Sequence, residues 1–503
     1  MVDYRQGIPR NQLILYAQYL DELVEEDNIV RIIDAYIDML DMYELGFQMN
    51  ENATGAPAYR PQLKLKIYIY GYLNGIRSSR RLERECVRNV ELKWLTEGLA
   101  PDFKTIADFR KDNRKAMKAV FKDFLSMCHR LELVQFHTVA IDGTKPRGQN
   151  SGNEIYRRDG IEQVEKEIQE RIESYLKELD ELDKRERSSG VSENPERIEQ
   201  LAKRLKKQQK RQDNVAAIKQ LFEEDLDLKT YFATDEESRL QSDKGKIRAG
   251  YNVQRAVDDK NKLIVVAEVT NEQNDKKQLT PMIEQIREQK EELGVEAETS
   301  VVADTGYFTE KEIMNTKDRD ECRPIVSAGA EGKESSESKC GKGKEVPSAA
   351  YENDQFRYDE QRDVYICPQD HELTRITRAP AIDRHGRATH RYRGNAKVCM
   401  ECPARALCTM SEKGRMLLVS ANQKEMAEYL ELLRNEENKR LMAQRKEIVE
   451  HPFGTLKRSL GYTYFLLKGV EKVTAEFNLM CLAYNLKRVF NIVGFQNLMA
   501  AIQ

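Results

Sequence analysis

The chain lacks the features that mark membrane and secreted proteins. It has 503 residues, yet no apolar run approaches the roughly 18 residues that a membrane-spanning helix needs. Its first residues, Met1–Arg5, do not lead into the apolar core of a signal peptide. We therefore expect a cytoplasmic protein of several globular domains, in which a reducing environment keeps cysteines as thiols.

An excess of positive charge is also absent. The 82 Lys and Arg residues are balanced by 85 Asp and Glu residues, giving a net charge of −3, which excludes a uniformly basic chain. The total decides nothing about nucleic-acid binding, which depends on where the charge lies. Residues 60–88 hold eight bases and two acids, and residues 203–211 hold six bases and no acid. The single tryptophan, Trp94, lies in an apolar helical pattern that favours core packing over base stacking.

The cysteine pattern does not indicate disulfides. Nine cysteines are an odd number, and four of them cluster, which favours a metal site. Cys399 and Cys402 have the spacing of a zinc knuckle, and Cys367 and Cys408 complete the four thiolates of a closed structural Zn²⁺ site. Two nearby histidines are substitute ligands, and four reduced cysteines without a metal are the alternative interpretation.

The N-terminal region, residues 1–132, has helical composition. Helices are predicted over 62–75, 80–88 and 105–131, the last opened by a capping box at Thr105–Asp108. Short basic helices joined by a tight turn indicate a unit like the helix-turn-helix, and an ordinary helical domain with a solvated basic face is the alternative. The candidates for DNA contacts are Arg80, Arg81, Arg84 and Arg110.

Residues 155–225 interrupt the chain with a dense run of Glu, Lys, Arg and Leu. The break at 188–195 predicts two long antiparallel helices joined by a loop, with acids dominating the first and bases the second. This hairpin is an insertion, because the apolar strand predicted at 138–144 has no partner before residue 248.

Alternating strands and helices follow the hairpin. Strands are predicted at 248–258, 263–270, 300–304 and 323–327, with helices at 274–292 and 309–317 between them. Three antiparallel strands followed by parallel ones, with a long helix after residue 422, are typical of an RNase H-like α/β domain. Residues 329–350 are rich in Gly, Ser, Lys and Glu and are predicted to form a mobile loop.

Three carboxylates occupy positions that suit metal-ion chemistry. Asp142 and Asp304 each end a β-branched apolar strand, and Glu450 lies on a segment of helical composition. Each one alone is explained as a turn former or a solvated helix residue. Together, and in this order, they can hold two divalent cations over a phosphodiester. Glu447, one turn earlier, competes for the third position, and Asp275 is interpreted as a helix cap that could also approach the metals.

The motifs that contain these acids resemble a known family. The chain is similar to the DDE transposases of bacterial insertion sequences, most of all to insertion-sequence family eleven-eighty-two, over nearly its whole length. The segments that carry the resemblance are Tyr59–Pro61, Tyr70–Arg80, Pro101–Arg110, Ala140–Lys145, Gly250–Gln254, Ala303–Tyr307 and Val449–Lys457.

The resemblance implies a mechanism and partners. Asp142, Asp304 and Glu450 would be the metal-binding catalytic triad for two Mg²⁺ or Mn²⁺ ions, which cut DNA at transposon ends and join it to target DNA. Lys457 would contact a phosphate of the transposon end, with a solvated lysine as the equal alternative. Family members assemble as homodimers on paired ends, so we expect a nucleoid-associated bacterial protein that binds terminal inverted repeats and target DNA.

The chain departs from the family pattern near the third acid. Related transposases often carry Tyr and Arg seven and four residues before this Glu, where Ala443 and Lys446 stand here; Arg445 is a possible substitute for the Arg. Pro452 also interrupts the helix. Two other functions are alternatives to a transposase. A nuclease that has lost strand transfer would keep all three acids. A DNA-binding regulator descended from a transposase would have a broken triad.

The expected organisation has six parts. They are a helical DNA-binding domain (1–132), the first strand of the RNase H-like catalytic domain (133–154), a helical-hairpin insertion (155–230), the continued catalytic domain (231–328), a flexible loop with a four-cysteine zinc-type insertion (329–415), and C-terminal helices that complete the catalytic domain (416–503).

Overall fold

The computed structural model describes residues 19–49, 58–189, 195–243, 245–319, 321–328, 351, 353–382 and 388–502. The predicted mobile loop at 329–350 lies outside these ranges. Within them, no helix combines the length and the apolar character that crossing a membrane requires.

The N-terminal region is helical, as predicted. Its helices are α1 (Ile29–Met39), α2 (Pro61–Leu73), α3 (Ser79–Arg88), α4 (Val90–Leu95), α5 (Phe103–Asp112) and α6 (Arg114–Arg130). The single helix predicted over 105–131 is wrong, because the chain breaks at Asn113 into α5 and α6. Its predicted start is also wrong: the carboxylate of Asp102 accepts the N–H groups of Lys104 and Thr105, so the helix begins earlier.

A five-stranded sheet forms the centre of the molecule. Its order is β7-β6-β1-β8-β9. Strand β1 pairs antiparallel with β6 and parallel with β8, while β6–β7 is antiparallel and β8–β9 is parallel. Three antiparallel strands followed by parallel ones is the predicted arrangement. The strands are β1 (Thr138–Thr144), β6 (Asn252–Asp258), β7 (Ile264–Thr270), β8 (Thr299–Ala303) and β9 (Cys322–Val326).

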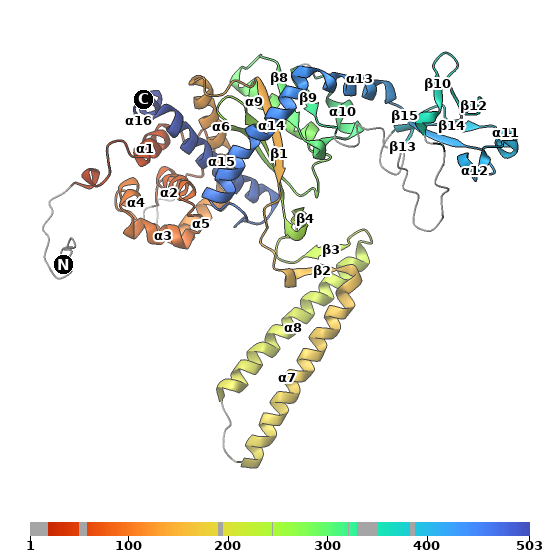
Figure 1. Ribbon diagram of the computed structural model, residues 1–503. Coiled ribbons are helices and arrows are strands. Elements are labelled where there is room, and N and C mark those ends of the chain that lie inside the picture. Colours follow the sequence, from red (N-terminus) through yellow and green to blue (C-terminus); the bar gives the residue numbers. More distant parts are fainter. Residues whose placement is uncertain are drawn as a thin grey trace, which may run out of the picture.

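Helices cover this sheet and join it to the N-terminal region. Helix α14 packs against β1, β8 and β9 and crosses β1 in Figure 1, and α15 packs against β7, α2 and α6. One continuous hydrophobic core includes the N-terminal helices, the sheet and α15. The helices are α9 (Leu279–Leu293), α10 (Glu310–Thr316), α13 (Gln423–Arg434), α14 (Glu436–Gly454), α15 (Val470–Val493) and α16 (Phe495–Ile502).

Two units project from the central body in Figure 1. One is the predicted helical hairpin, α7 (Ile161–Ser189) and α8 (Pro195–Glu224), with β2 (Ile155–Arg157) paired to β3 (Thr230–Phe232) at its base. Between it and the sheet, β4 (Arg239–Asp243) pairs with β5 (Lys246–Gly250).

The other unit contains the clustered cysteines. It is a six-stranded sheet with its own small hydrophobic core around Phe356, Tyr365 and Tyr392. Its elements are β10 (Arg357–Asp359), β11 (Val364–Ile366), β12 (Glu372–Arg375), β13 (Ala381–Ile382), β14 (Ala388–Gly394), α11 (Ala396–Glu401), α12 (Arg405–Cys408) and β15 (Met416–Ser420).

Candidate active site at the end of the central strand

Two of the predicted acids lie together at one edge of the sheet. Asp142 is near the end of β1, and Asp304 directly follows the neighbouring parallel strand β8. The guanidinium of Arg445, on α14, connects them: its Nη2 is 3.3 Å from Asp142 Oδ1 and 2.8 Å from Asp304 Oδ2. The fold therefore gathers two carboxylates that are far apart in sequence.

Asp142 is the more enclosed of the two. Its side chain is 20% exposed, against 45% for Asp304. Burial raises the pKa of Asp142 to about 6, although the charges of Arg445 and Arg255 oppose this rise, and Asp304 adds to it. Such a carboxyl exchanges its proton close to neutral pH, and a neighbouring cation favours its ionised form.

Arg255 is a buried cation beside Asp142. The two residues are cross-strand partners in β6 and β1, so their side chains lie on the same face of the sheet. Arg255 is 2% exposed, and its guanidinium carbon lies 3.5 Å from the centre of the Phe453 ring. Its Nε and Nη2 have no hydrogen-bond partner among the described residues. Burial lowers its pKa, and Asp142 is the nearby carboxylate that opposes this change. Arg255 therefore places a fixed positive charge next to Asp142, inside the protein.

A third carboxylate, Asp275, stands beside the same strand end. Its Oδ1 accepts hydrogen bonds from the amides of Asn252 and Gln254, at 2.7 Å each. A Cβ on Gly143 would lie only 2.8 Å from this oxygen, so the residue after Asp142 must be glycine for Asp275 to approach. Asp275 does not cap α9, because the N-cap position belongs to Gln278. The sequence interpretation of Asp275 as a cap is therefore wrong.

Tyr307 is the buried aromatic residue that packs against this cluster. It is fully buried, and its hydroxyl donates to Gln254 Oε1. Burial raises its pKa, and the negative charges of Asp275, Asp142 and Asp304 raise it further. Because its ring is inaccessible, Tyr307 packs against the acids inside the protein and cannot stack on a DNA base.

Glu450 does not join the two aspartates in this structure. Arg445 and the buried residues Ile448 and Val449 form the face of α14 that packs on the sheet. Glu450 is five residues after Arg445, or about 140° away around a helix. Its side chain is 65% exposed, with Lys446 Nζ 3.7 Å from its Oε1.

The neighbourhood of Glu450 is irregular. Pro452 lies inside α14, and residues Thr455–Ser459 form a π-helical turn (η7). The competing acid, Glu447, is also turned outward, with its side chain 79% exposed. Lys457, in the π-helical turn, places its amino group 5.2 Å from the centre of the Phe453 ring. In the described ranges, no group of three or more His, Cys, Asp or Glu side chains is close enough to hold a metal ion.

The four candidate DNA-binding arginines divide into two groups. Arg80, Arg81 and Arg84 are exposed on α3. Arg110 is only 5% exposed, and its Nη1 donates to the Tyr72 hydroxyl at 2.9 Å. The prediction that Arg110 contacts DNA is corrected by this position, because its guanidinium is enclosed by α2 and the turn before α3.

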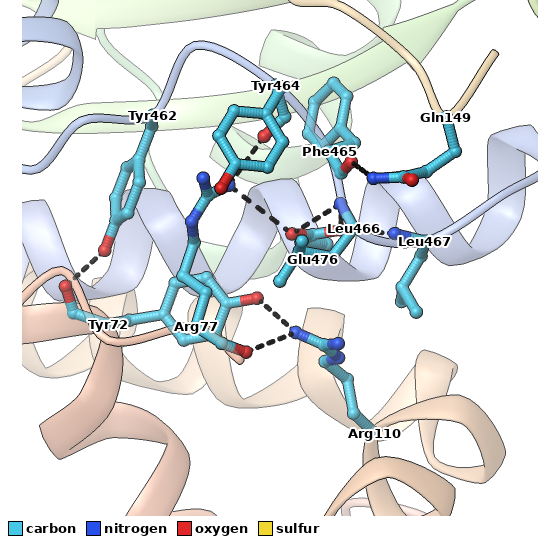
Figure 2. A network of polar contacts seen from close by, with 10 residues as sticks. All are labelled: Tyr72, Arg77, Arg110, Gln149, Tyr462, Tyr464, Phe465, Leu466, Leu467 and Glu476. Atoms are coloured by element: carbon cyan, nitrogen blue, oxygen red, sulfur yellow. Dashed lines mark hydrogen bonds and ion pairs between the residues drawn. The ribbon is translucent and has the colours of Figure 1, made fainter. Parts of the chain in front are cut away.

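Arg110 belongs to a polar network between the N-terminal helices and the segment before α15 (Figure 2). Arg77 donates to the Tyr464 carbonyl at 2.6 Å and lies 3.6 Å from the buried carboxylate of Glu476. Glu476 also accepts the N–H groups of Leu466 and Leu467. Sequence reasoning missed this network, because its two sides are separated by more than 350 residues and only the fold brings them together.

The four clustered cysteines line one pocket in the projecting sheet, with Gly394 and Arg415 among its other residues. A Cβ on Gly394 would lie 2.9 Å from Cys399 Sγ, so this glycine leaves room for the sulfur. The backbone N–H of His371 donates to Cys367 Sγ at 3.3 Å. Burial raises the pKa of the Cys408 thiol, and the three other cysteines, Cys367, Cys399 and Cys402, add to that rise.

Two family models match the chain. One, described as a transposase DDE domain, matches residues 366–490, which include Glu450 and the four cysteines. The other, described as a transposase domain (DUF772), matches residues 18–112, the region of the N-terminal helices. No curated protein matches.

Among solved structures, the chain is similar to a piggyBac transposase synaptic complex with hairpin DNA, at 9% sequence identity. The match covers 96% of this chain and 77% of the other, with a TM-score of 0.29. A likeness at this level carries no argument about the site.

Proposed function

We propose, from the premise that this chain is a DDE transposase, that Asp142 and Asp304 are the acids with which it cuts and joins DNA. The observation that carries this proposal is their meeting at the ends of two adjacent parallel strands, across the Arg445 guanidinium. The strand order β7-β6-β1-β8-β9 supports an RNase H-like catalytic domain around them.

The donor set fits divalent cations. Carboxylate oxygens are the ligands that Mg²⁺ and Mn²⁺ prefer. The guanidinium of Arg445 pairs with both aspartates, so one positive group can be shared between the two carboxylates at this position. Two such ions, when bound, activate an attacking oxygen and stabilise the leaving one. The chain itself holds Asp142 in position through the Gly143 N–H, at 3.0 Å, and through the charge of Arg255. Arg445 would have to release at least one aspartate for a metal to share it.

The sequence and the structure favour different residues for the third carboxylate. The family motif, and the DDE-domain match that contains it, support Glu450. The position beside the strand end supports Asp275. Replacing each by its amide distinguishes them: the residue that completes the site loses metal-dependent DNA cleavage, while the other variant keeps it. Glu447→Gln tests the competing acid of the sequence analysis, and Glu437→Gln, at an exposed carboxylate in the first turn of α14, is the matched control.

For DNA we propose contacts at the exposed arginines of α3 (Arg80, Arg81 and Arg84) and at Lys457. These contacts would hold the transposon end while the acids act on it, in a homodimer assembled on paired ends. The neutral variants Arg80→Gln and Arg84→Gln should weaken binding to DNA of any sequence, since phosphate contacts position DNA without reading its bases.

For the projecting sheet we propose a structural Zn²⁺ held by Cys367, Cys399, Cys402 and Cys408. The shared cavity and the N–H donated to Cys367 Sγ support this, because a donated hydrogen bond stabilises a thiolate ligand. Metal analysis of the purified protein should give one zinc per chain, and Cys402→Ser should reduce it. Purified protein without bound zinc, which also takes up none on titration, would contradict the proposal.

A joining assay separates the transposase from a nuclease with the same acids. Labelled DNA that carries the sequences flanking its own gene is incubated with the protein, target DNA and Mg²⁺. Labelled ends joined covalently to target DNA support transposition. Cleaved ends that are never joined would instead indicate a nuclease without strand transfer.

A further inference from the structure

The long arm formed by α7 and α8 has no role in the chemistry at the strand end. Its helices have 29 and 30 residues, and each is about 45 Å long. A small apolar cluster that includes Ile168, Ile172 and Val215 joins them near the body of the protein. In Figure 1 the arm extends well away from the central sheet. It therefore presents a surface that the rest of the described chain does not cover.

One face of this arm is strongly basic. On α8, Leu201, Leu205 and Val215 face α7, because they are buried or half-buried at helical spacing. Lys203, Lys206, Lys207 and Lys210 are all exposed, and at about 100° per residue they fall on the opposite side of α8. These four lysines define what we call the outer face of α8.

The charges on the outer face are poorly compensated. Lys203 pairs with Glu199 at 2.5 Å. For Lys206, Lys207 and Lys210, the structure gives no ion pair with any described residue, and the acid next along the helix is Asp213. Like charges three and four residues apart destabilise a helix. The cluster therefore weakens the isolated arm slightly, and a bound polyanion or acidic surface would offset this repulsion.

The first helix of the arm differs in this respect. Its exposed bases each have an acid four residues away along the helix; they are Lys166, Arg171, Lys177, Lys184 and Arg185. Among the side chains that the structure describes, the two helices thus carry similar numbers of exposed bases, but those of α8 lie together without an acid between them, from Lys203 to Lys210. This difference makes α7 an internal control for α8.

We propose that the outer face of α8 binds the phosphate backbone of duplex DNA, as a clamp on the DNA whose end is held at Asp142 and Asp304. This inference rests on the proposed function for the source of the DNA. The charge of the face, its exposure and its regular spacing along one side of a straight helix match a row of phosphates. The rival occupant, the acidic α7 of a second copy, is an outcome of the test below.

The experiment measures how DNA affinity depends on salt. A triple variant, Lys206→Gln, Lys207→Gln and Lys210→Gln, is compared with the wild-type protein for binding a fluorescent duplex, by anisotropy at several salt concentrations. Each phosphate contact contributes about 0.9 to the slope of log affinity against log salt, so losing three should reduce the slope by about 2.7. The control triple variant on α7, Lys166→Gln, Arg171→Gln and Lys177→Gln, should change it by less than about 1.

Several outcomes overturn the inference. A wild-type slope in the α8 variant, with its helical content confirmed by circular dichroism, would overturn it. So would a variant that loses self-association in sedimentation but keeps the wild-type slope, which would assign the face to a second copy. The proposed function fails separately: if Asp142→Asn cleaves DNA normally, the acids are wrong, whereas the salt slope still reports on α8.

Discussion

Replacing Asp142 by Asn should stabilise the metal-free protein at alkaline pH. The side chain is 20% exposed, and burial raises its pKa from 3.8 to about 6. A carboxyl whose pKa is higher in the folded than in the unfolded protein resists losing its proton on folding. The ionised form thus costs stability, and the neutral amide of Asn removes that cost.

The magnitude follows from the size of the pKa rise. Between pH 4 and pH 6 the folded protein retains a proton that the unfolded chain has lost, so stability falls as pH increases through this window. A rise of about two pKa units corresponds to a loss of about 3 kcal/mol in the free energy of unfolding. This loss is complete above pH 7 and absent below pH 4. The value of about 3 kcal/mol already includes the lost ion pair with Arg445, because the positive charge of Arg445 lowers the pKa of Asp142 and so reduces its net rise.

Urea unfolding in the presence of a chelator measures the effect. Trp94, the single tryptophan, packs against the core shared by the N-terminal helices and the sheet, so its fluorescence reports on that core. The difference between Asp142→Asn and wild type should grow from near zero at pH 4 to about 3 kcal/mol at pH 8. Asp183→Asn, on exposed α7, serves as the control. A stability difference that stays constant with pH would show that the pKa of Asp142 is not raised by folding.

Three other predictions concern the same structure. Glu476→Gln should destabilise the protein by about 3 kcal/mol in urea unfolding, because it leaves the buried charge of Arg77 without its carboxylate; an unchanged midpoint would contradict this. Arg110→Ala should lower the melting temperature and leave DNA affinity in anisotropy nearly unchanged, since Arg110 bonds to Tyr72 inside the protein; the reverse pattern would restore it as a DNA contact. Mg²⁺ affinity, measured by calorimetry, should fall about tenfold per pH unit below pH 6, because the proton on Asp142 must leave before the metal binds; an affinity independent of pH would contradict the raised pKa.

The sequence predicted the sheet well and its surroundings less well. The strands around Asp142 and Asp304 are continuous apolar runs that end in turn-forming residues, so both their extent and the position of the acids could be read directly. The arm could also be predicted from its charged helical composition. The break at Asn113 could not, because the apolar pattern continues through it from α5 into α6.

Side-chain direction was the main limit of sequence reasoning. Glu450 and Arg445 both belong to one helical pattern, and only packing decides that Arg445 faces the aspartates while Glu450 faces solvent. Arg110 looked like a solvated base for the same reason. Its partner Tyr72 lies on another helix, at a sequence distance that no periodicity could connect.

Whether Asp142 and Asp304 are the catalytic acids is decided by measuring metal-dependent DNA cleavage in their amide variants. Wild type, Asp142→Asn and Asp304→Asn are incubated with labelled DNA from the regions that flank the gene of this protein, with Mg²⁺ or with chelator. Glu437→Gln, an exposed carboxylate of α14, is the control. We expect wild type and the control to cleave DNA only with metal, and each aspartate variant to lose at least roughly two to three orders of magnitude in cleavage rate. Cleavage near the wild-type rate in either aspartate variant would contradict this assignment.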